Sequence, residues 1–551
     1  MIPIEDNRCL TLVKQPKLRY AESNQVLKKA TMKKLPVGIQ DFQKIIENNF
    51  VYIDKTRIIY ELIDRGVCYF FSRPRRFGKS VLISTLEALF ANKRNLFKGL
   101  WIDSSEYDWQ EYPIIRLDFS AIARSNACAL SDSIANRLTS IGTQYGITLT
   151  KTLLSDLLIE LIESLSRKNK VVILIDEYDK PLLDSINNLE IAKEIQQVLA
   201  SFYSAIKAQD QYIKFIFITG IARFSRTSIF SGLNNLNDIT YRNEYAHLVG
   251  YSENDLTILQ EQIDQVAQQE QVSPDAIKAT IQEWYNGFRF SYDDLKVYNP
   301  FSVIRYLESG VLANYWFTSG SPGYLAAIIA QHNYTFDGET IESLDGASMS
   351  ANADVTYDVE QFPLVPLLAQ SGYLTIKEYI KEKKKFTLTY PNKEVEEAFL
   401  ELFAHKITGA QPVKVADLVF DLKTALSKNN LTLFFELLTE FFAEIPHDIH
   451  IKLERYYQSI FYVILKLIGA QIVVERRTNI GRIDAVIETT SDIFIIEMKI
   501  NQTALSALEQ IKEKQYYQPY ARSDKDIILL GISFDTHRKN ISEWHQEALV
   551  L

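Results

Sequence analysis

Apolar runs of strand length alternate with amphipathic, helix-like segments through the first half of the chain. The runs lie at residues 66–71, 113–119, 171–175 and 213–218, and the run at 171–175 is apolar at every position. A short, wholly apolar run predicts a strand buried on both faces, as in the centre of a parallel sheet. The alternation continues to about residue 245. It therefore predicts an α/β domain whose parallel sheet is covered by helices on both sides.

Beyond this first domain the pattern becomes mostly helical, and the predicted helices of residues 246–300 suit a lid over a ligand site. Residues 362–390 predict a helix that ends at Gly372, followed by a hairpin whose tip, residues 381–385, is rich in lysine. A helix followed by a basic hairpin resembles a winged-helix module. The alternative is a solvated hairpin within a helical subdomain. Helical patterns resume at residues 393–445.

A second hairpin is predicted near the C-terminus. Its strands, residues 481–488 and 493–499, are joined by the polar turn Thr-Thr-Ser-Asp. Symmetrical pairing about this turn places Glu488 opposite Ile493. A helix and a further strand follow in the sequence, so the C-terminal segment is predicted to be a second, separate α/β domain.

This hairpin carries a candidate catalytic site. Continuing the register places Asp484 directly opposite Glu497, where two like charges destabilise a sheet unless a cation lies between them. Strand alternation puts Glu497 and Lys499 on the same face. Two carboxylates and an ammonium group at one point suit magnesium-dependent phosphodiester hydrolysis. In that chemistry Asp484 and Glu497 are oxygen ligands of Mg²⁺, or of Mn²⁺ in its place, and Lys499 activates the attacking water.

Two further residues are assigned to the same site. Glu454 begins a helical stripe that is otherwise mostly apolar, with Phe461, Leu465 and Ile468, and a carboxylate is unfavourable there unless it joins the metal site. Gln510 lies on the helix that follows the hairpin. The alternative interpretation is an exposed aspartate and a surface Glu/Lys pair on an amphipathic hairpin.

The other candidate site follows the first apolar run. Residues 73–80, Arg-Pro-Arg-Arg-Phe-Gly-Lys-Ser, lie between a predicted strand and an apolar-periodic helix, which is the layout of a phosphate-binding loop. The usual pattern has glycine where this chain has Arg73, so this loop is stiffer and more basic. A Gly-Lys-Ser tripeptide also occurs by chance. The predicted phosphate ligands are Arg73, Arg75, Arg76, Gly78, Lys79 and Ser80. The alternative for the three arginines is that they form salt bridges with neighbouring acids and hold the loop in place.

Two carboxylates support this loop as a nucleotide site. Asp176 and Glu177 follow the wholly apolar run and are delivered to the carboxyl edge of the sheet, where ligands bind. We expect Asp176 and Ser80 to hold Mg²⁺, and Glu177 to orient or deprotonate the attacking water. Acidic residues also follow strands as helix caps, which is the alternative explanation.

Two more residues that could contact a phosphate follow the predicted strand of residues 213–218. Thr219 stands where additional-strand ATPases place a polar sensor of the terminal phosphate, and Arg223 could reach a phosphate of its own site or of a neighbouring subunit. A role across subunits implies a homo-oligomer. Thr-Gly after a strand is also ordinary turn chemistry.

Several short motifs together resemble one family. The chain is similar to the bacterial AAA-ATPase-like proteins that are fused to a C-terminal PD-(D/E)XK nuclease-superfamily domain, and the resemblance runs from about residue 35 to the end. It implies that Arg73 is the family's own form of the loop, and Gln510 resembles the glutamine of the RecB-like branch. The motifs lie at residues 35–38, 52–56, 73–80, 231–236, 285–287, 298–301 and 315–316.

Composition bounds the remaining possibilities. The 551 residues are too many for one core. A net charge of −9 limits nucleic-acid contacts to local patches, and three dispersed cysteines make neither a disulfide framework nor a zinc site and favour a reducing cytoplasm. No apolar run is long enough to span a membrane. The predicted segments are a basic arm at 1–34, a P-loop core at 35–245, a helical lid and winged-helix region at 246–445, and a nuclease-like domain at 446–551.

The sequence therefore predicts an α/β protein with two chemical sites. Its fold class is a P-loop NTPase sheet of the AAA, additional-strand type, a helical middle with a winged helix, and a C-terminal domain like that of restriction endonucleases. We expect ATP and Mg²⁺ as cofactors and DNA or RNA as partner, with ATP hydrolysis controlling the nuclease. The alternative is a nucleotide-switched binding or signalling protein whose nuclease-like domain only recognises its partner.

Overall fold

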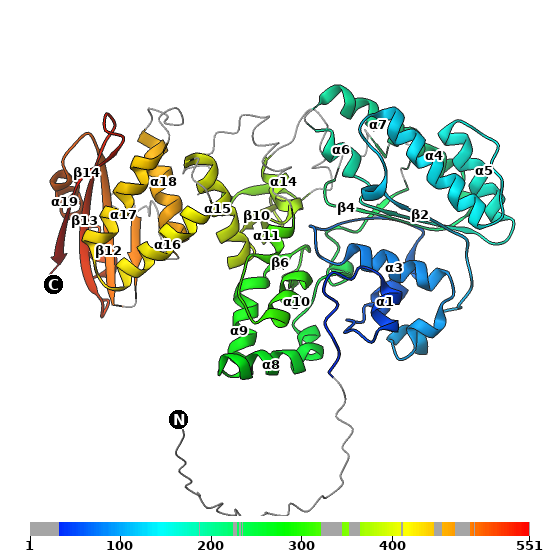
Figure 1. The fold of residues 1–551 in the computed structure, drawn as a ribbon, viewed down its shortest axis with the longest axis horizontal. Coiled ribbons are helices and arrows are strands. Elements are labelled where there is room, and N and C mark those ends of the chain that lie inside the picture. The colour runs from blue at the N-terminus through cyan, green and yellow to red at the C-terminus, as the bar shows by residue number, and fades with distance from the viewer. Residues whose placement is uncertain are drawn as a thin grey trace, which may run out of the picture.

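The computed structural model describes residues 32–549 except for gaps at 187, 224–228, 231–232, 234, 321–343, 352–363, 409–411, 446–453, 469–484 and 490. Within these residues the chain forms an α/β protein with two main sheets, joined by a mostly helical middle (Figure 1). In the described part of the chain, no helix is long and apolar enough to cross a membrane.

The N-terminal half contains the parallel sheet predicted from the apolar runs. Its strand order is β2-β3-β4-β1-β5, and every neighbouring pair is parallel. All six residues of β3 are buried, as expected for a strand covered on both faces. The strands are β1 (Cys68–Ser72), β2 (Ile114–Asp118), β3 (Val171–Asp176), β4 (Ile213–Gly220) and β5 (Asn237–Asp238).

Helices cover both faces of this sheet. Figure 1 shows α4, α5 and α7 above it and α1 and α3 below it. Their apolar stripes meet the strand side chains in the largest buried cluster of the molecule. The helices are α1 (Phe42–Glu47), α2 (Thr56–Arg65), α3 (Lys79–Phe90), α4 (Ala127–Gln144), α5 (Leu154–Ser166), α6 (Lys180–Asp184) and α7 (Leu189–Ala208).

The middle of the chain is helical, as predicted, with small sheets added. A three-stranded antiparallel sheet has the order β8-β10-β9, and β6 pairs with β7. The elements are α8 (Gln260–Glu270), α9 (Pro274–Tyr285), β6 (Phe288–Arg289), β7 (Lys296–Val297), α10 (Pro300–Ser309), α11 (Tyr315–Gly320), β8 (Ser348–Ser350), α14 (Leu364–Ser371), β9 (Thr375–Ile380) and β10 (Lys385–Thr389).

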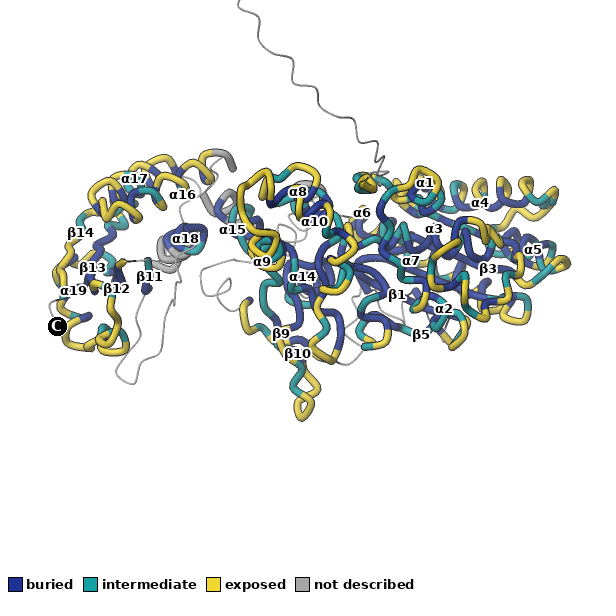
Figure 2. The backbone as a smooth tube through the Cα atoms, turned by 90° about the horizontal axis from the view of Figure 1, so that it is seen from below, coloured by how far each residue is buried: buried dark blue, intermediate teal, exposed yellow. Residues whose placement is uncertain are grey.

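The predicted helix and basic hairpin are both present in this middle region. Helix α14 ends at Ser371, and Gly372 follows with a φ of +93°, the left-handed conformation that terminates many helices. Strands β9 and β10 pair in antiparallel fashion around the lysine-rich turn. Figure 2 shows this hairpin projecting from the body of the molecule with an exposed tip.

The C-terminal part forms a mixed sheet of order β11-β12-β13-β14, in which only the central pair β12-β13 is parallel. Helix α19 covers one face, while α17 and α18 contribute to the core on the other face. The elements are α15 (Lys393–Thr408), α16 (Pro412–Ser427), α17 (Leu431–Glu444), α18 (Glu454–Leu467), β11 (Ala485–Glu488), β12 (Asp492–Ile500), α19 (Ala504–Glu513), β13 (Asp526–Asp535) and β14 (Asn540–Leu549).

Candidate functional site

The loop of residues 73–80, called the phosphate loop below, joins β1 to α3 and curls around a lysine. The Lys79 amine donates hydrogen bonds to the carbonyl oxygens of Arg73 (3.0 Å) and Pro74 (2.9 Å). Gly78 precedes the helix with a φ of +95° and has open space where a Cβ would stand. Burial lowers the pKa of Lys79. The loop therefore presents a helix N-terminus and a buried cation, which together suit an anion.

Arg73, which replaces the usual glycine, supports the loop through contacts of its side chain inside the protein. Its guanidinium donates to the carbonyl oxygens of Ser72 (2.8 Å) and Thr240 (2.7 Å) and lies over the rings of Phe71 and Phe290. Burial lowers the pKa of Arg73 to about 9. The side chain is thus used inside the protein, and the structure does not bring it together with the other predicted phosphate ligands.

Arg75 and Arg76 occupy the outer part of the loop. Arg76 has a φ of +68°, and its guanidinium lies 4.9 Å from the centre of the Phe301 ring in α10. The carbonyl oxygen of Arg75 accepts a hydrogen bond from the indole N–H of Trp316 in α11 (3.1 Å). The middle region therefore contacts the phosphate loop directly.

Asp176 and Glu177 lie at the carboxyl end of β3, beside the loop. Burial raises the pKa of Asp176, whereas a hydrogen bond with the Ser80 hydroxyl and the charge of Lys79 act to lower it. Glu177 has a φ of +51°, a backbone conformation that costs a non-glycine residue roughly 1–3 kcal/mol. Strain of this kind is often found at functional sites, and here it directs Glu177 away from the course of the strand.

These residues line a cavity of about 540 Å³. Its lining contains apolar side chains, among them Ile39, Val51, Ile53 and Tyr251, together with Lys180 and most of the predicted ligands. A lining that combines apolar and charged side chains suits a nucleotide. The sequence-predicted residues in the lining are Arg75, Arg76, Gly78, Lys79, Ser80, Asp176 and Glu177.

Thr219 and Arg223 lie outside this lining, like Arg73. Thr219 is completely buried at the end of β4. Arg223 is buried in an ion pair with Asp238, and its backbone N–H donates to the Gln370 side chain (2.8 Å). Burial acts to lower the pKa of Arg223, but the charge of Asp238 raises it above its ordinary value. The predicted roles of Thr219 and Arg223 toward a phosphate remain predictions.

Asp179 is a functional candidate that the sequence analysis missed. Its carboxylate accepts hydrogen bonds from the backbone N–H groups of Ile221 (2.8 Å) and Ala222 (2.6 Å), which follow β4. Burial raises the pKa of Asp179 to about 6, although these hydrogen bonds act to lower it. Asp179 thus ties the turn that carries Glu177 to the neighbouring strand. The signal in the sequence was the third acid of the Asp-Glu-Tyr-Asp run.

The second candidate site is built on the C-terminal hairpin. Glu488 pairs with Ile493 and Ala485 with Ile496, which confirms the predicted register over β11. Asp484, the residue before β11, lies outside the described residues. Ile495 contributes to the core under α19 and Met498 to the core on the opposite face, as strand alternation requires.

Glu497, Lys499 and Gln510 meet on the α19 face of the sheet. The Lys499 amine lies 3.4 Å from a carboxylate oxygen of Glu497 and also donates to the side-chain oxygen of Gln510, whose NH₂ group donates to Glu497. Glu497 is only 3% exposed. Glu497 pairs in the sheet with Gly531 of β13. Helix α19 can lie close to the sheet here because Gly531 has no side chain, and a Cβ at this position would stand 2.1 Å from the carbonyl oxygen of Ala504.

Glu454 is the first residue of α18, and its side chain is not among those described. The apolar stripe predicted after it is buried: Phe461 is 4%, Leu465 0% and Ile468 6% exposed. Among the described residues, no group of three or more His, Cys, Asp or Glu side chains is placed to hold a metal ion. The prediction of a metal site that includes Asp484 therefore remains a prediction.

Comparison with known proteins agrees with these two sites. Residues 36–230 match a family model described as predicted AAA-ATPase, and residues 452–544 match the PD-(D/E)XK nuclease superfamily. A protein of Azotobacter chroococcum mcd 1, named as uncharacterized in the vnfD 5' region, is 34% identical over 531 residues, which cover 94% of this chain and 99% of the relative. No solved structure matches the chain.

The relative is matched over almost its whole length, and each family model covers one of the two sites. The first model includes the phosphate loop and the Asp-Glu strand, and the second includes the hairpin with Glu497 and Lys499. The chain belongs to the predicted AAA-ATPase family and carries a PD-(D/E)XK nuclease-superfamily domain at its C-terminus.

Proposed function

We propose that this protein binds and hydrolyses ATP with Mg²⁺, and that its nucleotide state controls a Mg²⁺-dependent nuclease that cleaves DNA or RNA. The observation that carries the first half is the cavity in which Lys79, Ser80, Asp176 and Glu177 converge. The fused PD-(D/E)XK domain supports the second half.

Each of these four residues fits a role in phosphoryl transfer. The backbone N–H groups at the start of α3 and the Lys79 amine hold the phosphates. Ser80 and Asp176, already in contact, supply the oxygen ligands for Mg²⁺, which neutralises phosphate charge when bound. Glu177, in its strained conformation, orients the attacking water and accepts its proton. The apolar side chains of the lining, such as Ile39 and Val51, suit contact with the base.

The strand order agrees with an additional-strand ATPase fold. Strand β4 lies between β1, which leads into the phosphate loop, and β3, which ends in Asp176. Pro300, Phe301 and Ile304 of α10 line the cavity from the other side, so the helical middle acts as a lid. The β9–β10 hairpin, which follows α14, serves either as the wing of a winged helix or as a solvated hairpin of the helical subdomain.

The proposed nuclease chemistry uses the C-terminal hairpin. The sequence predicts Asp484 opposite Glu497, and in this proposal the two residues supply two carboxylates for a divalent cation. Lys499 lies next to Glu497, where it lowers the pKa of the attacking water and stabilises negative charge. Gln510 fixes the positions of both side chains through its two hydrogen bonds. Glu454, at the start of α18, completes the acidic set.

A series of contacts runs from the phosphate loop to α18, the helix that begins with Glu454. Trp316 binds the carbonyl oxygen of Arg75 in the phosphate loop through its indole, and its backbone N–H donates to the buried carboxylate of Glu394 (2.7 Å). Glu394 lies in the first turn of α15, and Glu396 of the same helix lies 3.6 Å from Lys466 of α18. A change in the phosphate loop on nucleotide binding can therefore reach the helix that begins with Glu454.

Cleavage of labelled single- and double-stranded DNA and RNA, with Mg²⁺ and with or without ATP, tests this proposal. Lys499→Ala is expected to reduce cleavage by about 10²–10⁴-fold, because it removes the cation beside the attacking water. Lys79→Ala is expected to weaken ATP binding and to remove the dependence of cleavage on ATP. Lys512→Ala is the matched control, since Lys512 lies on the same helix as Gln510 but pairs with Glu547 at the surface.

Cleavage that is unchanged in Lys499→Ala contradicts the nuclease assignment, and ATP affinity that is unchanged in Lys79→Ala contradicts the assignment of the loop. Calorimetry with Mn²⁺ measures independently whether the C-terminal site binds a divalent cation. ATP binding without cleavage and without Mn²⁺ binding favours the alternative, a nucleotide-switched protein whose nuclease-like domain is a recognition module.

A further inference from the structure

Lys180 is a cation of the cavity whose role the sequence analysis did not consider. It is the first residue of α6 and lines the cavity together with Lys79, Ser80 and Glu177. Its backbone N–H donates to the carbonyl oxygen of Glu177 (3.0 Å). The position of Lys180 is therefore fixed relative to the carboxylate proposed to orient the attacking water.

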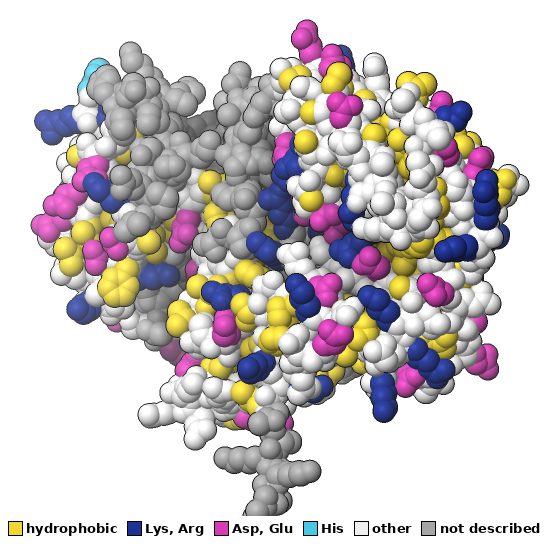
Figure 3. All heavy atoms as spheres, turned by 45° about the vertical axis from the view of Figure 1, so that its right-hand side comes forward, with side chains coloured by type: hydrophobic (Ala, Val, Ile, Leu, Met, Phe, Trp, Pro, Cys, Tyr) yellow, Lys and Arg dark blue, Asp and Glu magenta, His cyan; other side chains and the backbone are white. Residues whose placement is uncertain are grey.

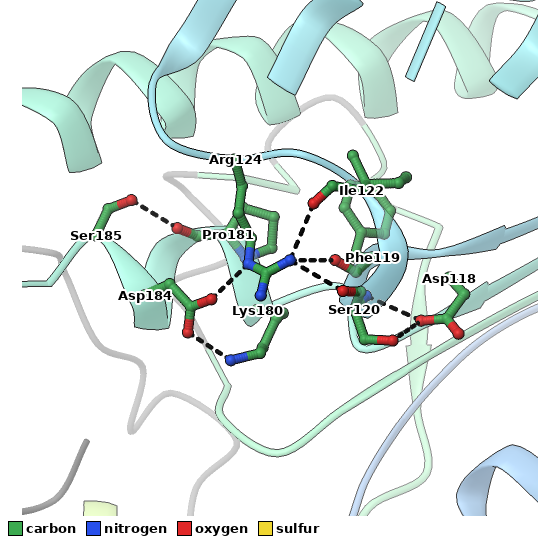
Figure 4. A network of polar contacts seen from close by, with 9 residues as sticks. All are labelled: Asp118, Phe119, Ser120, Ile122, Arg124, Lys180, Pro181, Asp184 and Ser185. Carbon is green, nitrogen blue, oxygen red and sulfur yellow. Dashed lines mark hydrogen bonds and ion pairs between the residues drawn. The ribbon is translucent and has the colours of Figure 1, made fainter. Parts of the chain in front are cut away.

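The Lys180 amine is held by a carboxylate that has a second partner. It lies 2.5 Å from an oxygen of Asp184, one turn along the same short helix, and the other oxygen of Asp184 binds the guanidinium of Arg124 (Figure 4). Burial alone raises the pKa of Asp184, but hydrogen bonds from Lys180 and Arg124 lower it below its ordinary value. Asp184 is therefore a charged acceptor shared by two cations.

The two cations differ in how firmly they are held. Figure 4 shows the guanidinium of Arg124 also donating to backbone carbonyl oxygens, among them those of Ser120 (3.0 Å) and Ile122 (2.9 Å). Among the contacts described, the Lys180 amine binds only Asp184. If Lys180 moves, Asp184 keeps Arg124 as its partner, so the movement leaves no unpaired carboxylate.

We propose that Lys180 is a ligand of the terminal phosphate of a bound nucleoside triphosphate, and that its amine leaves Asp184 when that phosphate is present. The proposal rests on the proposed ATP site. A phosphate is the stronger partner, because it carries more charge than a carboxylate and accepts charge-assisted hydrogen bonds through several oxygens. Arg223, for which the sequence suggested contact with a phosphate of its own site or of a neighbouring subunit, forms a buried ion pair with Asp238.

Titration calorimetry on the full chain tests this assignment with ADP and with a non-hydrolysable ATP analogue, both with Mg²⁺. Lys180→Gln is expected to weaken binding of the ATP analogue by about ten- to a hundredfold, because one charged hydrogen bond is lost. Its affinity for ADP is expected to stay within roughly twofold. Lys180→Arg is expected to restore most of the preference for the triphosphate. Lys207→Gln, an exposed lysine in the last turn of α7, is the control.

Asp184→Asn separates the phosphate contact from the pair itself. This substitution releases the Lys180 amine without removing it, so the preference for the triphosphate is expected to persist. The proposal is overturned if Lys180→Gln weakens both nucleotides equally or neither, or if Asp184→Asn loses the preference as Lys180→Gln does. A wild-type chain that binds no nucleotide overturns the proposed ATP site, whereas these outcomes with intact wild-type binding overturn only the role of Lys180.

Discussion

At the scale of single residues, Glu394 shows how one buried ionisable group can determine the pH dependence of the stability of the whole protein. Its carboxylate is completely buried and accepts hydrogen bonds from the Ser302 hydroxyl and from the backbone N–H of Trp316. Burial raises the pKa of Glu394 from its ordinary 4.5 to about 8, even though these hydrogen bonds act to lower it. The native protein therefore holds a proton at Glu394 near neutral pH.

This raised pKa predicts a pH dependence of stability. Between pH 4.5 and about 8 the native state binds more protons at Glu394 than the unfolded state. Its contribution to the free energy of unfolding is therefore complete below pH 4.5 and is lost as the pH rises through about 8. Glu394→Gln imitates the protonated carboxyl group and is expected to flatten this decline, measured as the denaturant midpoint across that range.

The exposed Glu440 provides the control, because Glu440→Gln changes the same chemical group at the surface of α17. It is expected to leave the pH profile as it is in the wild type. A Glu394→Gln profile that follows the wild type over the whole range means that Glu394 is ionised in the native protein.

The same scale shows what the sequence could predict about the sites. The sequence could predict that Lys79, Ser80, Asp176 and Glu177 lie together, because each stands at a fixed position after a strand and the end of a parallel strand determines where the next residue lies. For Arg73 the sequence left two roles open, contact with a phosphate or support of the loop. An arginine in a loop can face a cavity or the core, and the carbonyl of Thr240 that holds it is distant in the sequence.

At the scale of elements, the β9–β10 hairpin is the clearest candidate for contact with a nucleic acid. Its tip, residues 381–384, is exposed and contains three lysines, Lys381, Lys383 and Lys384. Figure 3 shows basic and acidic side chains interspersed over the visible face of the described molecule. The hairpin was predicted from its pattern, but its pairing with β8 was not, since β8 precedes it by a long connection.

We expect the triple substitution of these lysines by alanine to weaken binding of DNA or RNA, because each lysine on a phosphate releases counterions. The slope of log K against log salt is expected to fall by up to about 0.9 for each duplex phosphate that the variant no longer neutralises. Fluorescence anisotropy at several salt concentrations measures both quantities. The control is the same triple change at three exposed lysines of and beside α16, namely Lys414, Lys423 and Lys428. Equal binding by both variants supports a solvated hairpin.

At the scale of the whole molecule, the N-terminal sheet and the middle region share one core. The Phe77 ring of the phosphate loop packs edge-on against two rings of the middle region. Its centre lies 4.8 Å from the centre of the Phe288 ring and 5.4 Å from that of the Phe290 ring. A Cβ on Gly372 would stand 2.8 Å from the Pro74 side chain, so the end of α14 lies directly on the loop. The composition predicted several domains but could not show this, because the contacts join residues far apart in the sequence.

A fragment that ends at residue 245 is therefore expected to be unstable, since it leaves the Phe77 side of the loop without its apolar cover. Its exposed apolar surface should bind the dye ANS and promote aggregation, which size-exclusion chromatography detects. The full chain retains Phe288, Phe290 and Gly372 against the loop, and it is expected to bind less dye and to remain monodisperse. If the fragment is monodisperse and binds ATP, the N-terminal sheet folds without the middle region.

The hydrogen bond between Trp316 and the phosphate loop has a spectroscopic consequence. The emission of an indole depends on the polarity of its surroundings and on its hydrogen bonds. The Trp316 N–H is bound to the carbonyl oxygen of Arg75, within the loop proposed to bind phosphates. The chain has five tryptophans, so one indole contributes an appreciable share of the total tryptophan emission. The protein thus contains its own optical reporter of the loop, which allows nucleotide exchange to be followed in real time without an attached label.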